Sequence, residues 1–133
     1  MSTYLLDTSV LVDALRGVRG RPGILERLIQ DGHLLACSAI TVAEVFAGMK
    51  PKEREATVAL LDSLEHYDIT RPVAEQAGLL RREWSVRGKT LALPDLLIAS
   101  VALTHGLILL TDNAKDFPMK DLQLHTFGSE TSS

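Results

Sequence analysis

The sequence has few of the residues that cross-link a protein or stack on its ligands. Its 1 cysteine, Cys37, excludes an internal disulfide and a zinc site built from several thiolates. Cys37 lies in the apolar run LLACSAI, where a buried thiol is the usual arrangement. Aromatic residues make up 5% of the chain, which excludes a surface that recognises its ligand mainly by ring stacking. Because a chain without disulfides is typical of a reducing compartment, we expect a cytoplasmic protein.

Long hydrophobic runs and an excess of one charge are also missing. The longest apolar stretch, residues 91–110, is interrupted by Pro94 and Asp95, so it predicts no membrane span. The N-terminal segment lacks a basic leader and contains Asp7 and Asp13, which argues against a signal peptide. With 14 Lys and Arg against 17 Asp and Glu, the net charge of −3 excludes non-specific coating of nucleic acid.

Several catalytic signatures are absent as well. Neither a GxGxxG nor a P-loop sequence occurs, and the 4 histidines follow no HxxxH spacing. No local pattern supports Ser/His or Cys/His catalysis. The chain does have an ordinary globular balance, with 133 residues of which 46% are hydrophobic, and this length suits one core. We expect a single domain over residues 1–133, with a frayed tail over 128–133.

Short apolar runs alternate along the chain with longer amphipathic ones. The short runs predict strands over 3–6, 34–37, 67–70, 107–110 and 123–127. The segments between them predict helices over 7–17, 23–30, 38–48, 51–66, 72–84 and 94–104. Strands separated by helices need crossover connections. The predicted fold class is therefore α/β, with a central, mostly parallel sheet of four to five strands and helices on both faces.

Polar side chains follow two of the predicted strands. Asp7 comes directly after the first strand, and the fourth strand is followed by Asp112, Asn113 and Asp116. In open parallel sheets, ligands bind in the crevice outside the carboxyl ends of the strands. We therefore expect these side chains to line one crevice.

Two further acids lie in segments that are otherwise apolar. Asp95 precedes LLIASVAL, and Glu44 lies in the middle of ITVAEVFAG. An ionised carboxylate in such surroundings is costly unless a cation or hydrogen-bond donors compensate it. Each acid also has a structural alternative. Asp7 and Asp95 can be helix N-caps, Glu44 can be an exposed helical glutamate, and the acids after the fourth strand can be turn formers.

The placement of all these acids around one crevice favours a metal site over separate structural roles. Several carboxylates in one pocket cannot all ionise without a counter-charge, and their hard oxygen ligands suit Mg²⁺ or Mn²⁺. An ion held in this way can activate a water molecule and stabilise the leaving oxygen of a phosphodiester.

Four stretches of sequence carry a resemblance to a known family. They are LLDTSVLVDAL at 5–15, SAITVAEVFAG at 38–48, GKTLALPDLLIASVALTHG at 88–106 and LILLTDNAKDF at 107–117. In this order and spacing, the chain resembles the PIN-domain ribonucleases, and most closely the VapC toxins of prokaryotic VapBC toxin-antitoxin pairs. The resemblance covers most of the chain and implies a PIN-like fold.

The resemblance also implies roles for individual residues. Its last motif has the form T-x-N/D-x-x-D/E-F, which puts Asn113 and Asp116 in functional positions and Asp112 in the free one, and we prefer Asp116 as the fourth acid. The implied catalytic residues are Asp7, Glu44, Asp95 and Asp116. Of these, the implied metal ligands are Asp7, Asp95 and Asp116, with Glu44 completing the set directly or through water. The implied supporting polar residues are Thr8, Ser9, Thr111 and Asn113.

By the same resemblance, the chain is expected to be a Mg²⁺- or Mn²⁺-dependent endoribonuclease and a homodimer. Its expected partners are RNA and a cognate VapB-type antitoxin, whose C-terminal segment lies in a groove near the active site. Two basic clusters can hold RNA phosphates or acidic antitoxin residues, or can be solvated surface. They are Arg16, Arg19, Arg21 and Arg27, then Arg81, Arg82, Arg87 and Lys89.

Two other functions stay open at this point. The chain can be a PIN-like binding module that uses the acidic crevice for a structural metal or a partner peptide. It can also be a phosphatase-like hydrolase, although that class places a second acid two residues after the first, where this sequence has Ser9.

Overall fold

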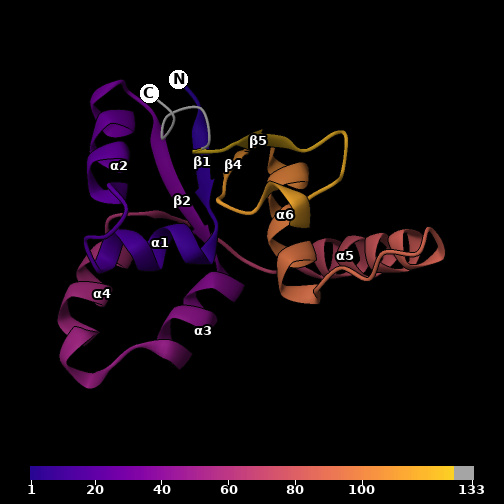
Figure 1. Cartoon of the computed structure of the whole chain (residues 1–133), viewed down its shortest axis with the longest axis horizontal. Coiled ribbons are helices and arrows are strands. Elements are labelled where there is room, and N and C mark those ends of the chain that lie inside the picture. Colours follow the sequence, from indigo (N-terminus) through magenta and orange to yellow (C-terminus); the bar gives the residue numbers. More distant parts are fainter. Residues whose placement is uncertain (128–133) are drawn as a thin grey trace.

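The computed structural model describes residues 1–127, and the tail predicted over 128–133 lies outside them. A 5-stranded sheet runs through the middle of the molecule in the order β3-β2-β1-β4-β5, and every pairing between neighbours is parallel (Figure 1). The strands are β1 (Thr3–Leu6), β2 (Leu34–Ser38), β3 (Glu65–Tyr67), β4 (Ile108–Leu110) and β5 (Gln123–His125). The predicted α/β class and parallel sheet are confirmed.

Helices connect the strands and cover both faces of the sheet. The α-helices are α1 (Thr8–Leu15), α2 (Arg21–Gln30), α3 (Ala39–Gly48), α4 (Arg54–Asp62), α5 (Arg71–Val86) and α6 (Leu93–His105). Two short 3₁₀ turns are η1 (Pro51–Glu53) and η2 (Ala114–Asp116). In Figure 1, α1, α2 and α4 lie on one side of the sheet, and α5 and α6 lie on the other. In the described part of the chain, no helix is long and apolar enough to cross a membrane.

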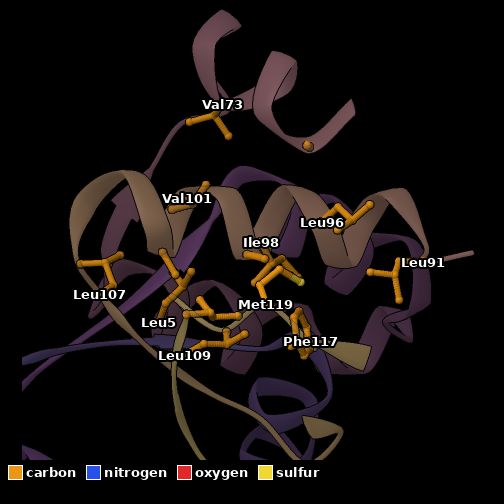
Figure 2. Packing of buried hydrophobic residues seen from close by; sticks show 14 of the residues in the cluster. Leu5, Val73, Leu91, Leu96, Ile98, Val101, Leu107, Leu109, Phe117 and Met119 are labelled. Atoms are coloured by element: carbon orange, nitrogen blue, oxygen red, sulfur yellow. The ribbon is translucent and has the colours of Figure 1, made fainter. Parts of the chain in front are cut away.

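The strand side chains divide the core into two clusters. Leu5 and Leu6 of β1 are both 0% exposed, and they point to opposite faces of the sheet. Leu5 packs with α5 and α6, whereas Leu6 packs with α1, α2 and α4. Figure 2 shows the first cluster, in which Ile98 of α6 points toward Leu5 and Leu109 of the sheet. Burial on both faces explains why β1 and β4 read as continuous apolar runs.

The third strand lies two residues earlier than predicted. The helix predicted over 51–66 divides into η1 and α4 and ends at Asp62, and the strand predicted over 67–70 is β3, Glu65–Tyr67. β3 is an edge strand, held by backbone bonds to β2 with little apolar burial of its own, so its exposed Glu65 and His66 give no apolar signal.

Other boundaries differ by smaller amounts. The helix predicted from residue 23 begins at Arg21, because Pro22 suits the first turn. The last strand ends at His125, before the predicted limit at residue 127. Gly106 ends α6 as predicted, because its left-handed φ of 66° is a conformation that glycine adopts readily.

Candidate functional site

Asp7 joins the end of β1 to the start of α1. Its backbone N–H donates to the Leu110 carbonyl at 3.0 Å, which ties the strand end to β4. Its Oδ1 accepts from the Thr8 backbone N–H at 2.9 Å, and its Oδ2 accepts from the Thr111 hydroxyl at 2.7 Å. Asp7 is therefore a helix N-cap, as one of the two interpretations of the sequence held.

Burial makes the Asp7 carboxylate costly to ionise. The residue is only 5% exposed. Burial raises the pKa of Asp7, and the nearby charges of Glu44 and Asp112 raise it further. The bonds from Thr111 and Thr8 favour the ionised form and offset part of this increase in pKa. The Asp7 carboxylate is therefore fixed in orientation, and a nearby positive charge would stabilise its ionised form.

Glu44 reaches the same place from α3. Its Oε1 accepts from the Thr8 hydroxyl at 2.7 Å. The Thr8 and Thr41 hydroxyl oxygens lie 3.0 Å apart, and since the Thr8 proton goes to Glu44, Thr41 donates to Thr8. Glu44 is exposed, so the expectation of mainly apolar surroundings was wrong: its side of α3 faces an open cleft. The hydroxyl chain holds it toward Asp7.

Asp95 lies in the first turn of α6. The N-cap of this helix is Ala92, so the interpretation of Asp95 as an N-cap was wrong. The side chain is half-buried, and burial together with the charges of Asp7, Asp116 and Glu44 raises the pKa of Asp95 to about 6. A position near a helix N-terminus also favours the carboxylate by its dipole. The four implied catalytic acids therefore act electrostatically on one another.

The segment after β4 contributes side chains in two directions. Thr111 is fully buried and bonds to Asp7, and its Oγ1 accepts from the Asn113 backbone N–H at 3.0 Å. Asp116 lies in η2 and is half-buried. Asp112 forms an ion pair with Arg21 and lies 3.6 Å from Arg19. The two candidates for the fourth catalytic acid, Asp112 and Asp116, therefore have different surroundings.

An open cleft of about 360 Å³ lies among these residues. It is lined by Asp7, Thr8, Ser9, Val12, Asp13, Glu44, Asp95 and Asn113. Asp116 is not part of the lining, although its charge reaches Asp95. Ser9 is one of the lining residues, and its buried hydroxyl has no hydrogen-bond partner among the described residues.

The donors of this cleft fit a hard divalent cation. They are oxygens only, and within residues 1–127 no Arg, Lys or His forms an ion pair with Asp7, Glu44, Asp95 or Asp116. Mg²⁺ and Mn²⁺ prefer such ligands. Among those residues, no three acidic, His or Cys side chains are already drawn together as a metal site.

The basic residues of the two clusters differ in their exposure and in their partners. Arg16 forms a half-exposed pair with Glu53 at 3.4 Å. On α5, Arg81 is half-buried and Arg82 is exposed. The remaining two members of that cluster have partners of their own. Arg87 pairs with Glu83 and lies over the Trp84 ring, and Lys89 donates to the Lys115 carbonyl at 2.9 Å, beside Asp116.

Arg21 does not belong to a surface cluster. It is 4% exposed and pairs with Asp112, so the interpretation of its charge as available to RNA or an antitoxin was wrong. Thr41 was not predicted as a site residue. A threonine in the apolar segment that follows Ser38 could have indicated it, and the structure shows that this threonine is buried.

The sequence model of the PIN domain matches residues 4–121, and the chain belongs to that family.

The chain is also similar to individual ribonucleases. Ribonuclease VapC19 of Mycobacterium tuberculosis is 33% identical over 120 residues, covering 90% of this chain and 96% of the relative. Ribonuclease VapC10 of the same species is 36% identical over 115 residues, covering 86% of each. The resemblance found in the sequence is confirmed.

Solved structures agree with these relatives. VapBC2 from Rickettsia felis, bound to a DNA fragment from its promoter, has a TM-score of 0.82 and 28% identity, covering 93% of this chain and 98% of that one. A toxin-antitoxin complex from Klebsiella pneumoniae has a TM-score of 0.76 and 32% identity, covering 92% and 96%. The PIN-like fold is confirmed.

Proposed function

We propose that this chain is a cytoplasmic, metal-dependent endoribonuclease of the VapC type, the toxin of a toxin-antitoxin pair. The observation that carries the proposal is the convergence of Asp7, Glu44 and Asp95 on one cleft at the carboxyl ends of the strands. The VapC ribonucleases to which the chain is similar supply the reaction class, hydrolysis of RNA phosphodiester bonds.

Each acid has a defined part in this proposal. Asp7, Asp95 and Asp116 would hold Mg²⁺ or Mn²⁺, with Glu44 completing the set directly or through water. The bound ion supplies a Lewis acid that lowers the pKa of a water molecule and stabilises the leaving oxygen. Thr111 fixes the rotamer of Asp7, and Thr8 fixes that of Glu44. Ser9 lines the same cleft as a further hydroxyl residue close to Asp7 in the sequence.

Removal of metal tests this proposal. We expect excess EDTA to reduce cleavage of a structured RNA by roughly 100-fold or more, because the carboxylates alone repel a phosphodiester. Added Mg²⁺ or Mn²⁺ should restore the rate. Circular dichroism of the EDTA-treated protein provides the control that the fold persists. Full activity in excess EDTA contradicts the proposal.

The cleft also indicates how an antitoxin would inhibit the enzyme. A neighbouring groove of about 260 Å³ lies between α1, α3 and α4, and it shares Val12 and Glu44 with the cleft. A segment in this groove can insert an Arg or Lys toward Asp7 and Glu44, replacing the charge of the metal. Acidic antitoxin residues or RNA phosphates would then pair with the exposed Arg16 and Arg82 and with the half-buried Arg81.

We also propose a homodimer that uses α5. Leu79 and Val86 are 64% and 84% exposed, and they lie two helical turns apart on one side of α5. We expect Leu79→Glu combined with Val86→Glu to convert the dimer to a monomer, because burial of charge at an apolar contact is costly. Light scattering at micromolar concentration measures this change.

The matched control for the dimer is Ile29→Glu, a substitution of another exposed apolar residue on α2. It should leave the dimer intact. A wild-type monomer in the same measurement contradicts the dimer itself, and an intact dimer in the double variant contradicts the assignment to α5.

A further inference from the structure

Arg21 forms an ion pair that is buried and joins distant parts of the chain. Its guanidinium bonds to Asp112, donates from Nη1 to the Arg19 carbonyl at 3.0 Å, and lies 3.6 Å from the centre of the Phe127 ring. The two side chains are only 5% and 12% exposed. Burying two charges costs about as much free energy as their attraction returns, so such a pair is weak evidence for a role in stability alone.

Details of the pair agree with that conclusion. Nε of Arg21 and Oδ2 of Asp112 are buried and have no hydrogen-bond partner among the described residues, and Nη1 of Arg19 lies 3.6 Å from that Oδ2.

The backbone before Arg21 is shaped to deliver this side chain. Arg19 has a φ of 57° and Gly20 a φ of 69°, both in the left-handed region. A non-glycine residue in that region costs of order 1 kcal/mol. Arg21 then begins α2 with its side chain directed at the segment after β4. The chain therefore tolerates local strain where it places this guanidinium.

Asp112 lies next to the residues that orient the acid cleft. Thr111 donates to Asp7, and Asn113 donates its backbone N–H to the Thr111 hydroxyl. Because Thr111 faces Asp7 while Asp112 faces Arg21, fixing Asp112 also fixes the direction of Thr111. The same segment continues into η2, which carries Asp116.

We infer that Arg21 is a positioning residue. Through Asp112 it holds residues 111–116 so that Thr111 orients Asp7 and Asp116 keeps its place in η2. This inference rests on the proposed function for its catalytic consequence, but its structural consequence can be measured without any activity.

The double variant Arg21→Met with Asp112→Leu separates positioning from stability. Replacing a buried ion pair by apolar residues of similar volume is often neutral or stabilising, so we expect thermal stability near that of the wild type. Positioning would nevertheless be lost. We expect kcat to fall about tenfold with a smaller change in KM, and the Mn²⁺ dissociation constant to rise about tenfold, as when partners of metal ligands are removed.

Hydrogen exchange supplies a readout that needs neither metal nor RNA. The Asn113 and Asp116 amides, bonded to the Thr111 hydroxyl and the Asn113 carbonyl, should exchange at least several-fold faster in the double variant. The matched control is Arg71→Gln with Glu75→Gln, which removes an exposed pair on α5 and should change none of these quantities.

Wild-type kcat, Mn²⁺ affinity and exchange in a folded double variant overturn the inference. If that variant does not fold, Arg21→Lys decides by the same three measurements, because an ammonium keeps the charge but cannot copy the planar guanidinium. Wild-type values for Arg21→Lys then overturn it, and losses in the same direction support it. If the wild type itself neither binds Mn²⁺ nor cleaves RNA, the proposed function fails, while hydrogen exchange still tests the positioning role.

Discussion

Asp7→Asn should abolish RNA cleavage, lowering the rate by roughly 10³-fold or more, as expected when a central group of a catalytic set is removed. Asp7 is the acid that the fold restrains most closely, by the Thr8 amide and the Thr111 hydroxyl. Asparagine keeps the oxygen that caps α1, and its amide can donate to Thr111 in place of accepting. The variant should therefore fold, and rates under single-turnover conditions measure the loss of the charge.

Stability provides the second readout for this variant. Burial raises the pKa of Asp7, so the group's contribution to stability is present at low pH and is lost as the pH rises through its folded-state pKa. In EDTA at neutral pH, Asp7→Asn should therefore melt at a higher temperature than the wild type. The difference should shrink as the pH falls and the wild-type carboxyl becomes protonated, which begins above the usual range of an aspartate because its pKa is raised.

The two readouts together separate a catalytic role from a structural one. Loss of activity with equal or higher stability is the result that the cleft predicts. Near-wild-type cleavage by Asp7→Asn contradicts the assigned role, and loss of activity together with unfolding in EDTA shows that Asp7 serves mainly as the cap of α1.

Much of the fold could be predicted from the sequence because its central strands are buried on both faces. β1, β2 and β4 consist mostly of apolar residues, so their positions are visible as short runs. β3 could not be placed in this way. Its residues pair along the edge of β2 through backbone bonds, which side-chain hydrophobicity does not report.

The candidate site shows the same division. Acids that directly follow a strand, such as Asp7, were predictable because strand ends meet at one edge of a parallel sheet. The bonds from Thr41 to Thr8 and from Arg21 to Asp112 were not predictable, since residues 21 and 112 are brought together only by the complete fold. The grouping of Arg21 with neighbouring basic residues predicts a position on the surface, and its burial follows only from the complete fold.

Substitutions of Asp116 and Asp112 should have very different effects on the rate of RNA cleavage. Asp116→Asn should lower RNA cleavage by roughly 100-fold, whereas Asp112→Asn should lower it about tenfold. The reason is the direction of each charge. Both acids act on the cleft, since Asp116 raises the pKa of Asp95 and Asp112 raises that of Asp7, but the charge of Asp112 is already compensated by its ion pair with Arg21.

The free energy of unfolding in EDTA should change in the opposite order. Asp116→Asn removes a charge that repels Asp95, so the metal-free protein should be as stable as the wild type or more stable. Asp112→Asn leaves the buried Arg21 guanidinium without its counter-charge, which should cost about 2 kcal/mol. Chemical denaturation in EDTA, measured beside cleavage rates with Mn²⁺, tests both orders. Equal losses of activity, or a larger loss for Asp112→Asn, assign the fourth acid to Asp112. If Asp112→Asn is as stable as the wild type, the ion pair with Arg21 does not explain the orientation of Asp112.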